Sequence, residues 1–500
     1  MKILERVERL GNRLPDPATL FFIGTVFVIL LSALAAGLDW SVRSDIAGRF
    51  EAKSLLSSDG IWWLTSHLVE NFIQFPPLAI VLVGMLGIGV AEASGLLPAL
   101  LRHVILRIPD SLLSPATVFL GIMSSIALDA GYVVLPPIAA ALYQAAGRSP
   151  LAGIAAAFAG VSAGFSANLS ITALDPLLSG LSQSGARILV EDYQVAVTAN
   201  WWFMIVSTVV LTLVGWLVTD RIVEPAQSRP LERPGPPASP SEETDTASMN
   251  RGLKFALLAF LISFGVVLLA ILVPGAPLFG EGDYFARWVE ATIPLLFLLL
   301  LIPGIFYGFA AGTIQNDRDV ARMMGETMAR MGPYIVLAFF AAQFIECFKY
   351  SGLGEMLAIG GGQWLTHWQI PTSLLLIGFI LMTMLANLLI GSASAKYAFF
   401  APVFVPMFMQ VGISPELTQA AYRVGDSISN TITPLNPYMV IMLAHMQYYA
   451  RRSGLGTLIA MMLPYTLAFA LVWILLLVLW IILGPPLGPG GGLEIPLPGK

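Results

Sequence analysis

The chain has 500 residues, of which 57% are hydrophobic and only 11% are charged, and its formal net charge is −5. A soluble domain usually carries about 25% charged residues, so this composition excludes an ordinary soluble protein. The single cysteine, Cys347, excludes an internal disulfide framework. We therefore predict an all-α polytopic membrane protein whose surroundings are the lipid bilayer, and we expect no nucleic-acid partner.

Residues 1–18 are predicted to form an amphipathic segment on the cytoplasmic side. Basic residues next to membrane spans collect in the cytoplasm, which places the N-terminus inside. A cleavable signal peptide is the alternative, because Ala-Leu-Ala at 33–35 resembles a cleavage site. Glu5 and Glu8 interrupt the positive head, however, and the apolar run is long for a signal. The basic residues of the segment are Lys2, Arg6, Arg9 and Arg13.

Several apolar runs approach the roughly 20 residues that a helix needs to cross a bilayer. Their number predicts a chain that crosses the membrane many times. The runs lie at 19–37, 78–90, 112–126, 151–164, 201–218, 255–273, 293–309, 334–348, 373–389 and 459–483.

One segment divides these runs into two halves. Residues 223–250 are rich in Pro, Ser and Glu, a composition that cannot bury a core, and we predict a disordered cytoplasmic linker there. The first membrane half then covers 19–222 and the second covers 251–484. The Gly- and Pro-rich stretch 485–500 is predicted to be a disordered tail.

The two halves share sequence in two blocks. DAGY at 129–132 aligns with SAKY at 394–397, an offset of 394 − 129 = 265 that also superposes the Gly-X-Ser-Pro runs ending at Pro150 and Pro415. GFSANLSITALDP at 164–176 aligns with GDSISNTITPLNP at 425–437, an offset of 425 − 164 = 261 with six identical positions. Chance recurrence of Gly, Ser and Pro is the alternative, but the common order and the nearly constant offset favour an internal duplication.

The 164–176 and 425–437 segments are polar and carry prolines, although each lies between apolar runs. Non-helical backbone at membrane depth persists only where protein buries it or where it lines an aqueous cavity. Corresponding interruptions in two halves of a membrane chain are typical of a secondary transporter. We therefore expect the two segments to meet and to form a site.

Charged residues at membrane depth are costly and usually mark a transport path or a buried pair. Arg423 and Asp426 are three residues apart and share a helix face, with Asn430 on the same side. Mutual neutralisation of the two charges is the structural alternative to a transport role. Asp175, which precedes Pro176, could bind a cation, carry a proton or cap a helix.

Enzymatic function has little support. GVSAG at 160–164 has the form of a nucleophile elbow, but it lies in an apolar run without a strand–turn–helix context. The four histidines form no pair at metal-binding helical spacing, and no phosphate-binding Gly-Lys-Ser/Thr loop is present. We predict that the protein is not an enzyme and not an ATP-driven pump.

Four stretches of the chain resemble the p-aminobenzoyl-glutamate transporter (AbgT) family. SASAKYAFFAPVFVPM at 392–407 and ISPELTQAAYRVGDSISNTITPLNPY at 413–438 carry the most specific similarity. GTIQNDRDVARMM at 312–324 and GVSAGFSANLSITALDPLLSG at 160–180 are also similar to family segments. The resemblance covers most of the chain and omits the linker and the tail.

The resemblance implies a homodimer in the bacterial inner membrane. Each protomer would have nine transmembrane helices, two re-entrant helical hairpins and an inverted internal repeat, with the N-terminus cytoplasmic and the C-terminus periplasmic. The implied functions are uptake of p-aminobenzoyl-glutamate, a folate breakdown product, and export of sulfonamide antimetabolites. Coupling to a sodium or proton gradient belongs to the same inference, which implies no cofactor apart from Na⁺ as a coupling ion.

The positions that the resemblance assigns to substrate and transport lie in both polar segments and in the run between them. One of them departs from the family pattern, because Tyr397 stands where SASAKW-like members have tryptophan. Tyrosine keeps a ring for stacking but loses area and adds a hydroxyl, which affects the expected substrate preference. The assigned positions are Asp175, Ser394, Tyr397, Pro415, Arg423, Asp426 and Pro434.

Under this hypothesis, Arg423 faces the carboxylates of an imported substrate, and amide and carboxylate oxygens form a candidate sodium site. For Asn387, a hydrogen bond to a neighbouring helix is the commoner alternative. The candidate sodium ligands are Asn168, Asn387, Asp426 and Asn430.

Three rival functions stay open from the sequence. The first is a sodium-coupled importer of another organic anion, such as a dicarboxylate, which would share the hairpins and Arg423. An ion channel would also tolerate broken helices, although duplicated halves favour alternating access. An intramembrane hydrolase depends only on GVSAG.

Overall fold

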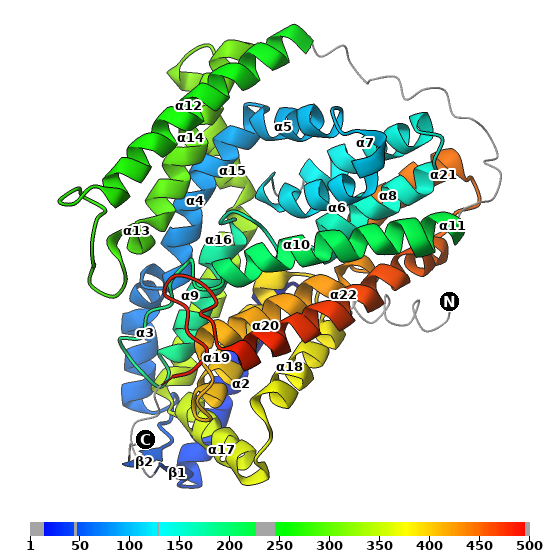
Figure 1. Ribbon diagram of the computed structural model, residues 1–500. Helices are drawn as coiled ribbons and strands as arrows, with labels where there is room; N and C mark the ends of the chain where they lie inside the picture. The colour runs from blue at the N-terminus through cyan, green and yellow to red at the C-terminus, as the bar shows by residue number, and fades with distance from the viewer. Residues whose placement is uncertain (1–14, 45–47, 128–129, 227–245, 496–500) are drawn as a thin grey trace.

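The computed structural model describes residues 15–44, 48–127, 130–226 and 246–495, and nearly all of them are helical (Figure 1). The exception to the predicted all-α fold is one antiparallel hairpin of β1 (Ser41–Ser44) and β2 (Gly48–Glu51). This hairpin follows the first helix, α2 (Pro17–Gly37), which Asp16 caps by accepting a hydrogen bond from the amide of Ala18 at 2.9 Å.

Within the described residues, seven helices are long and apolar enough to cross a membrane. One of them is the 36-residue stretch formed by α3 and α4, and an eighth span results if α5 and α6, bent by 114°, count as one. The spans are α2, α3 (Ser58–Ile73) with α4 (Pro76–Ala93), α10 (Trp201–Val218), α12 (Thr246–Leu272), α14 (Thr292–Ala311), α16 (Gly332–Tyr350) and α22 (Leu455–Leu483), and the bent pair is α5 (Leu96–Ile105) with α6 (Leu113–Met123).

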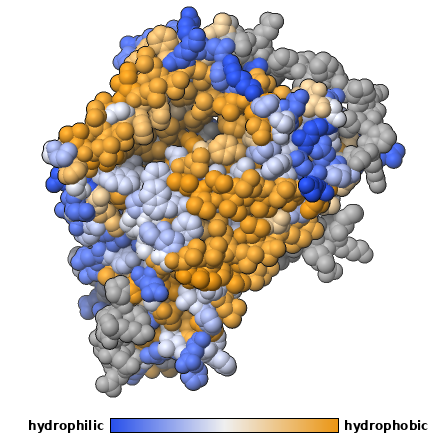
Figure 2. Space-filling model, in the orientation of Figure 1, coloured by the Kyte–Doolittle hydropathy of each residue, from blue (hydrophilic) through white to orange (hydrophobic). Residues whose placement is uncertain are grey.

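The outer surface of these helices is apolar, as a lipid-facing surface must be. Figure 2 shows hydrophobic residues gathered over α12 and over the adjoining α10 and α22, with hydrophilic patches towards the ends of the molecule. Leu257, Leu261 and Leu269 of α12 and Leu467 and Leu471 of α22 are all more than half exposed. A soluble monomer rarely exposes so extended an apolar surface, which agrees with the predicted membrane location.

Shorter helices form two series with the same order of elements. Each has a Pro-containing helix, a turn with a left-handed glycine, a second helix that begins at a proline, a break and a third helix. Gly147 (φ 72°) and Gly412 (φ 85°) supply the turns, and Pro150 and Pro415 begin the second helices. The series are α7 (Ala130–Ala145), α8 (Pro150–Phe158), α9 (Leu174–Ala186) and α19 (Ala393–Met409), α20 (Pro415–Ile428), α21 (Met439–Tyr449).

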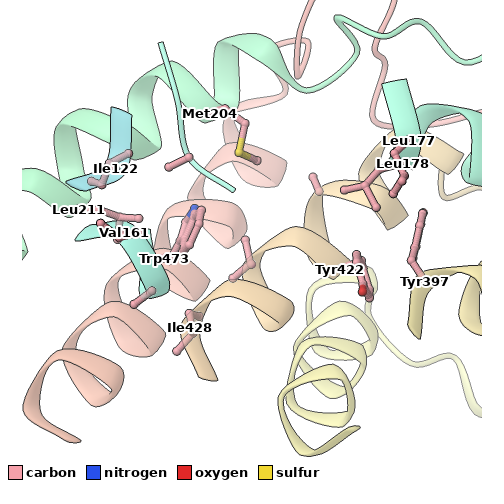
Figure 3. Close-up of a cluster of buried hydrophobic side chains, with 14 of the residues drawn as sticks. Ile122, Val161, Leu177, Leu178, Met204, Leu211, Tyr397, Tyr422, Ile428 and Trp473 are labelled. Atoms are coloured by element: carbon pink, nitrogen blue, oxygen red, sulfur yellow. The ribbon is translucent and has the colours of Figure 1, made fainter. Parts of the chain in front are cut away.

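The two series interlock. Helix α9 of the first packs on α19 and α20 of the second, and α21 of the second packs on α7 and α8 of the first. Figure 3 shows part of the core beside them, with Ile122 and Val161 near Trp473, and with Leu177 near Tyr397 and Tyr422. Because each series contributes its last helix to the other, the two breaks are brought together at the centre.

The remaining helices lie around this centre. Helix α15 is polar and follows a capping box in which Asn316 accepts from the amides of Arg318 and Asp319. Helix α18 packs on α20, and α17 packs on α19. Their bounds are α11 (Glu224–Ala226), α13 (Arg287–Glu290), α15 (Asp317–Arg330), α17 (Leu353–Trp368) and α18 (Thr372–Asn387).

An ion-pair cluster holds the turn before α8 to the π-helical turn Thr219–Val223 and to α11, which follow α10. Arg148 donates to Asp220 at 2.6 Å and to Glu224 at 3.0 Å, and its guanidinium lies 4.5 Å from the ring centroid of Tyr143. Burial works against the charge, but the bonds to the two carboxylates hold the pKa of Arg148 above its ordinary value. Arg148 therefore stays charged and anchors the first series.

The predicted disordered tail at 485–500 is wrong for residues 485–495. The carbonyl of Leu487 accepts from the amide of Phe203 at 2.9 Å, and the amide of Ile495 donates to the carbonyl of Gly412 at 3.0 Å. Gly491 packs so closely that a Cβ there would lie 1.9 Å from the carbonyl oxygen of Ala199. A high glycine content is typical of disordered tails, but here glycine permits close backbone contact.

Two other predicted segments fall mostly outside the described residues. Of the predicted linker at 223–250, residues 227–245 lie outside them, and the flanking parts are helical and belong to α11, α12 and the turn before α11. Of the N-terminal segment at 1–18, residues 1–14 lie outside them.

Close packing around the first break gives a test of the fold. A Cβ at Gly160 would lie 2.4 Å from the carbonyl oxygen of Val118 and 2.9 Å from the Cα of Gly121. We expect Gly160→Ala to lower the free energy of unfolding by roughly 1–3 kcal/mol, because backbone must move to admit the methyl group. Thermal denaturation of the purified protein measures this.

Gly265 of α12 is the matched control for that substitution. A Cβ at Gly265 would meet no atom within 4 Å, so Gly265→Ala should leave stability unchanged or raise it by at most about 1 kcal/mol. Equal melting temperatures for the two variants would contradict the predicted contact between α6 and the first break.

Candidate functional site

Both predicted interruptions are present. In the first, α8 ends at Phe158, a π-helical turn covers Ala159–Ala163, and α9 begins at Leu174. In the second, α20 ends at Ile428, a 3₁₀ turn covers Ser429–Thr431, and α21 begins at Met439. The second break is shorter than the 425–437 segment, since its first four residues still belong to α20.

The first break contacts the end of α20 and the second break through polar groups that are buried or partly buried. The amide of Ser166 donates to the hydroxyl of Ser427 at 3.2 Å, and the side-chain amide of Asn436 donates to the hydroxyl of Ser162 at 3.1 Å. Asn430 also donates to the carbonyl of Ser162, at 3.4 Å. Polar groups in a helix break have no partner within their own helix, so each segment supplies hydrogen-bond partners for the other. At membrane depth such groups must be paired.

Arg423 joins the breaks by charge. Its Nη1 lies 2.6 Å from the Oδ1 atom of Asp175, and its Nη2 donates to the carbonyl of Ser166 at 2.8 Å. The other carboxylate oxygen of Asp175 accepts from the amide and the hydroxyl of Thr172, at 2.7 and 2.8 Å. Asp175, in the first turn of α9, therefore ties Thr172 of the first break to that helix and neutralises an arginine from the other series, a role that differs from the cation binding, proton carrying and helix capping expected from the sequence.

Asp426 shares its helix with Arg423 but pairs elsewhere. Its Oδ1 lies 2.7 Å from the Nζ atom of Lys396 on α19, and both side chains are almost wholly buried. The hydroxyl of Tyr422, which donates to the carbonyl of Ala393 at 2.6 Å, also lies 3.3 Å from this oxygen. The predicted common helix face is correct, but the alternative that Arg423 and Asp426 neutralise each other is wrong, because each has a closer partner on another helix.

Asn387 connects Asp426 to the second break. Its side-chain NH₂ group donates to the backbone carbonyl of Asp426 at 3.0 Å, to Ser429 Oγ at 3.0 Å and to Asn430 Oδ1 at 2.8 Å. Its side-chain oxygen accepts from the ammonium of Lys396. The amide thus bridges α18 to α20, the role that the sequence offered as the commoner alternative to cation binding.

The four candidate sodium ligands do not converge on one point. Asp426 and Asn387 direct oxygens at Lys396, and Asn430 Oδ1 accepts from Asn387. Asn168 lies in the first break, where it donates to Ser125 at 2.9 Å and accepts from the amide of Ser170 at 2.9 Å. Over the described part of the chain, no group of three or more His, Cys, Asp or Glu side chains could hold a metal ion. In this arrangement the residues do not fit a sodium ion.

The other predicted positions lie close to these pairs. Tyr397 is fully buried, its hydroxyl is 2.7 Å from that of Ser182, and its ring centroid is 4.2 Å from that of Tyr422. Pro415 begins α20, and Pro434 lies in the second break. Ser394 sits near the start of α19, where its hydroxyl is 3.1 Å from that of Ser392.

Comparison with known proteins identifies the family to which this site belongs. The model of the family described as "AbgT putative transporter family" matches residues 2–494. The chain belongs to the AbgT family. It is 34% identical over 475 residues to the p-aminobenzoyl-glutamate transport protein of Escherichia coli (strain K12), covering 94% of this chain and 92% of that protein.

Two solved transporter structures are similar to this one along almost their whole length. The YdaH transporter of Alcanivorax borkumensis, described as having an unusual topology, is 42% identical with a TM-score of 0.90, covering 95% of this chain and 100% of that one. MtrF of Neisseria gonorrhoeae, described as illuminating a class of antimetabolite efflux pumps, is 41% identical with a TM-score of 0.91, covering 98% and 100%. The resemblance found in the sequence is confirmed, and with it a multi-pass membrane protein of a transporter family.

In this AbgT-family protein, sequence reasoning missed two residues of the site. Lys396 is one, although it is the only Lys, Arg, Asp or Glu between Glu355 and Glu416, and a lone charge in so apolar a stretch calls for a partner. Gln419 is the other; it lies one turn before Arg423, so helical spacing alone could have placed the two side chains together.

Several buried donors at the site have no hydrogen-bond partner among the described residues. They are the Nε of Arg423, the Nε2 of Gln419 and the hydroxyl of Ser166. The oxygen of Gln419 does accept a bond, from Ser182 at 2.8 Å. Buried polar groups are normally paired, so unpaired donors beside an arginine indicate a place for an acceptor that the chain itself does not supply.

Proposed function

We propose that this protein is an ion-gradient-coupled secondary transporter of p-aminobenzoyl-glutamate-like folate fragments, of sulfonamide antimetabolites, or of both. The observation that carries the proposal is Arg423, which joins α20 to the first break and to Asp175 of α9 in the protein interior and keeps an unpaired Nε–H. The names of its relatives, a p-aminobenzoyl-glutamate transport protein and an antimetabolite efflux pump, support these two substrate classes.

We place the carboxylate end of the substrate at Arg423 and Gln419. These residues are one turn apart on α20, and both have unpaired donors. Charge-assisted bonds from a guanidinium to a carboxylate are stronger than neutral ones. A carboxylate would satisfy these donors while Asp175 keeps the guanidinium oriented from its other side.

We place the aryl end of the substrate beside the tyrosine pair. Ser182 hydrogen-bonds both to Tyr397 and to Gln419, so the paired rings of Tyr397 and Tyr422 adjoin the proposed carboxylate position. A para-substituted aniline is common to p-aminobenzoyl-glutamate and to sulfonamides, so one aromatic wall serves both. The smaller ring of Tyr397, where tryptophan is usual, favours the less bulky substrates.

An apolar cavity offers a route towards the first break. It has a volume of about 530 Å³ and is lined by α5, α6, α12 and α14, and it also reaches Ser124 and Ser170. Drug-sized ligands usually occupy pockets of about 300–1,000 Å³. We propose that the aryl part of the substrate passes through this space on its way to the site.

We further propose that the two series are an inverted repeat and that each break forms the tip of a re-entrant hairpin. Their common order of elements, with matching glycine turns and prolines, supports a duplication. We expect nine spans per protomer, a homodimer in the bacterial inner membrane, a cytoplasmic N-terminus and a periplasmic C-terminus. Rocking of one repeat against the other would then expose the site to each side in turn.

Flux into proteoliposomes tests the proposed function. Labelled p-aminobenzoyl-glutamate and a labelled sulfonamide are each assayed under an imposed sodium gradient and an imposed proton gradient. Saturable flux of either compound, driven by one of the gradients, is expected. Flux of a labelled dicarboxylate that p-aminobenzoyl-glutamate does not inhibit would instead favour an importer of another organic anion.

The role of Gln419 gives a separate prediction. In Gln419→Leu, we expect the KM for p-aminobenzoyl-glutamate to rise about tenfold or more, because a hydrogen bond to a charged group is lost. Gln343, a buried glutamine between α16 and α3, is the matched control. Gln343→Leu should reduce stability at least as much as Gln419→Leu does and should leave the KM unchanged. Equal KM values for the two variants would remove Gln419 from the site.

A further inference from the structure

Glu416 is a buried acid near the start of α20 that lacks a counter-charge. In the described part of the chain, five Asp, Glu, Lys or Arg residues are buried, and four of them form the ion pairs Arg423–Asp175 and Lys396–Asp426. Glu416, which is 3% exposed, is the fifth, and it forms no ion pair with a described residue. With Glu416 ionised, the site would therefore carry one uncompensated negative charge.

The carboxylate of Glu416 also has few hydrogen-bond donors. The hydroxyl of Tyr193 lies 3.2 Å from each of its oxygens, whereas the nearby hydroxyl of Ser414 donates to the carbonyl of Gly492 at 2.8 Å. The amino end of α20 favours the anion, but by much less than the hydration that a carboxylate loses on burial. A buried acid in these surroundings is more stable in its neutral form.

The titratable groups around Glu416 supply no positive charge to it. Arg187, which follows α9, donates to a backbone carbonyl of the loop before α10 at 3.1 Å, and the acids of that loop are exposed. On α19, the neighbouring group is the buried hydroxyl of Tyr397. In the last described segment, Glu494, whose backbone pairs with that of Ile413, is a further exposed acid.

Glu416 lies on the same face of α20 as the proposed position of the substrate carboxylate. Gln419 follows it by three residues and Arg423 by seven, so the three side chains line one side of the helix. The charges of Glu416 and Arg423 both act on the hydroxyl of Tyr397, so the acid adjoins the site. A substrate carboxylate at Gln419 would face an ionised Glu416 as a like charge, which disfavours both anions. The substrate can therefore bind well only when Glu416 carries a proton.

We propose that Glu416 is a proton-binding group of the substrate site, neutral whenever the substrate carboxylate lies at Gln419 and Arg423, so that the anion and a proton bind together. The proton comes from water and adds to a carboxylate oxygen of Glu416. This deepens the proposed function, on whose carboxylate position and ion coupling it rests. By linkage, the proton raises the affinity for the substrate by the same factor as the substrate raises the affinity for the proton.

Binding and proton uptake, measured together in weakly buffered detergent solution, test the coupling. Wild type and Glu416→Gln, which copies the neutral acid, are titrated with p-aminobenzoyl-glutamate from about pH 5 to about pH 9, where the carboxylates of the substrate stay ionised. At the alkaline end, wild type should take up close to one proton per bound substrate, and its Kd should rise by up to about tenfold per pH unit. Glu416→Gln should take up no proton and keep a constant Kd.

Glu355 provides the matched control. It is a partly buried glutamate on α17, outside the proposed site. Glu355→Gln should take up a proton on binding as wild type does. Loss of proton uptake in Glu355→Gln, with uptake kept in Glu416→Gln, would assign the proton to Glu355 and contradict the proposal.

Thermal stability tests the same acid without substrate. Folded Glu416 keeps a proton that the unfolded chain releases above about pH 4–5, so the Tm of wild type should fall relative to that of Glu416→Gln as the pH rises. A difference in Tm between the two proteins that is the same at every pH would show that Glu416 is ionised in the folded state, and would overturn the proposal.

The outcomes separate this inference from the proposed function. Normal binding of p-aminobenzoyl-glutamate with equal proton uptake by wild type and Glu416→Gln would overturn the coupling alone. Absence of uptake by wild type would do the same, whether or not the variant folds. Failure of wild type to bind p-aminobenzoyl-glutamate at any pH would overturn the coupling together with the proposed function, and the Tm comparison would still decide whether Glu416 holds a proton.

Discussion

Replacing Arg423 with methionine is expected to abolish transport and to lower the free energy of unfolding by about 3–5 kcal/mol. The substitution leaves the buried carboxylate of Asp175 without its counter-charge and removes the bond to the carbonyl of Ser166. Flux in proteoliposomes and denaturation in mixed micelles measure the two effects. The double variant Arg423→Met/Asp175→Leu should recover much of the stability, because no buried charge is left unpaired, but should not recover transport.

Arg322 provides the control for that experiment. It lies on the polar helix α15, its side chain is 59% exposed, and it pairs with Asp319 at 3.0 Å. An exposed pair of this kind contributes at most about 1 kcal/mol, so Arg322→Met should transport normally and unfold almost as wild type does. Transport by Arg423→Met at the rate of Arg322→Met would show that Arg423 only supports the fold.

Asp426→Ala is expected to abolish transport while the protein still assembles to the same oligomeric state. The change leaves the ammonium of Lys396 with only the side-chain oxygen of Asn387 and the distant carbonyl of Ile390. It also removes the carboxylate that neutralises Lys396. Flux assays and size-exclusion chromatography of the same preparation measure the two properties.

Asp319→Ala is the matched control for this loss, because Asp319 is also an aspartate within a helix but caps α15 at the surface. It should reduce stability slightly and leave flux intact. Normal flux in Asp426→Ala would exclude Asp426 from the mechanism, whatever its effect on stability.

The positions of the helix breaks could be predicted from sequence because they follow from local chemistry. A Ser-, Asn- and Pro-rich tract does not form an uninterrupted helix between apolar runs. Such a tract occurs in each half of the chain, at 164–176 and at 425–437. That the two tracts meet was expected from the need to satisfy buried backbone groups, and the bond between Ser166 and Ser427 is one contact through which they do. Physical reasoning of this kind needs no knowledge of the tertiary arrangement.

The partners of the charged residues could not be predicted in the same way. Helical spacing placed Arg423 and Asp426 on one face, but which acid or base each meets depends on how α9 and α19 pack against α20. Asp175 is distant from α20 in sequence and meets Arg423 only because the two series interlock, whereas Lys396 meets Asp426 because α19 packs on α20 within the second series. The order of residues 485–495 escaped prediction for a related reason, since its hydrogen bonds reach back to Gly412 and Phe203.

The most direct test of the central claim, that the two breaks meet, is a cross-link between Ser166→Cys and Ser427→Cys in a background with Cys347→Ala. Since Cys347 is the only native cysteine, the pair reports on this contact alone. We predict a disulfide in native membranes, detected by mass spectrometry, because the hydrogen bond from the backbone amide of Ser166 to the hydroxyl of Ser427 places the two residues in direct contact. Cross-linking no faster than for Ser166→Cys with Ser263→Cys, on the lipid-facing helix α12, would contradict the account.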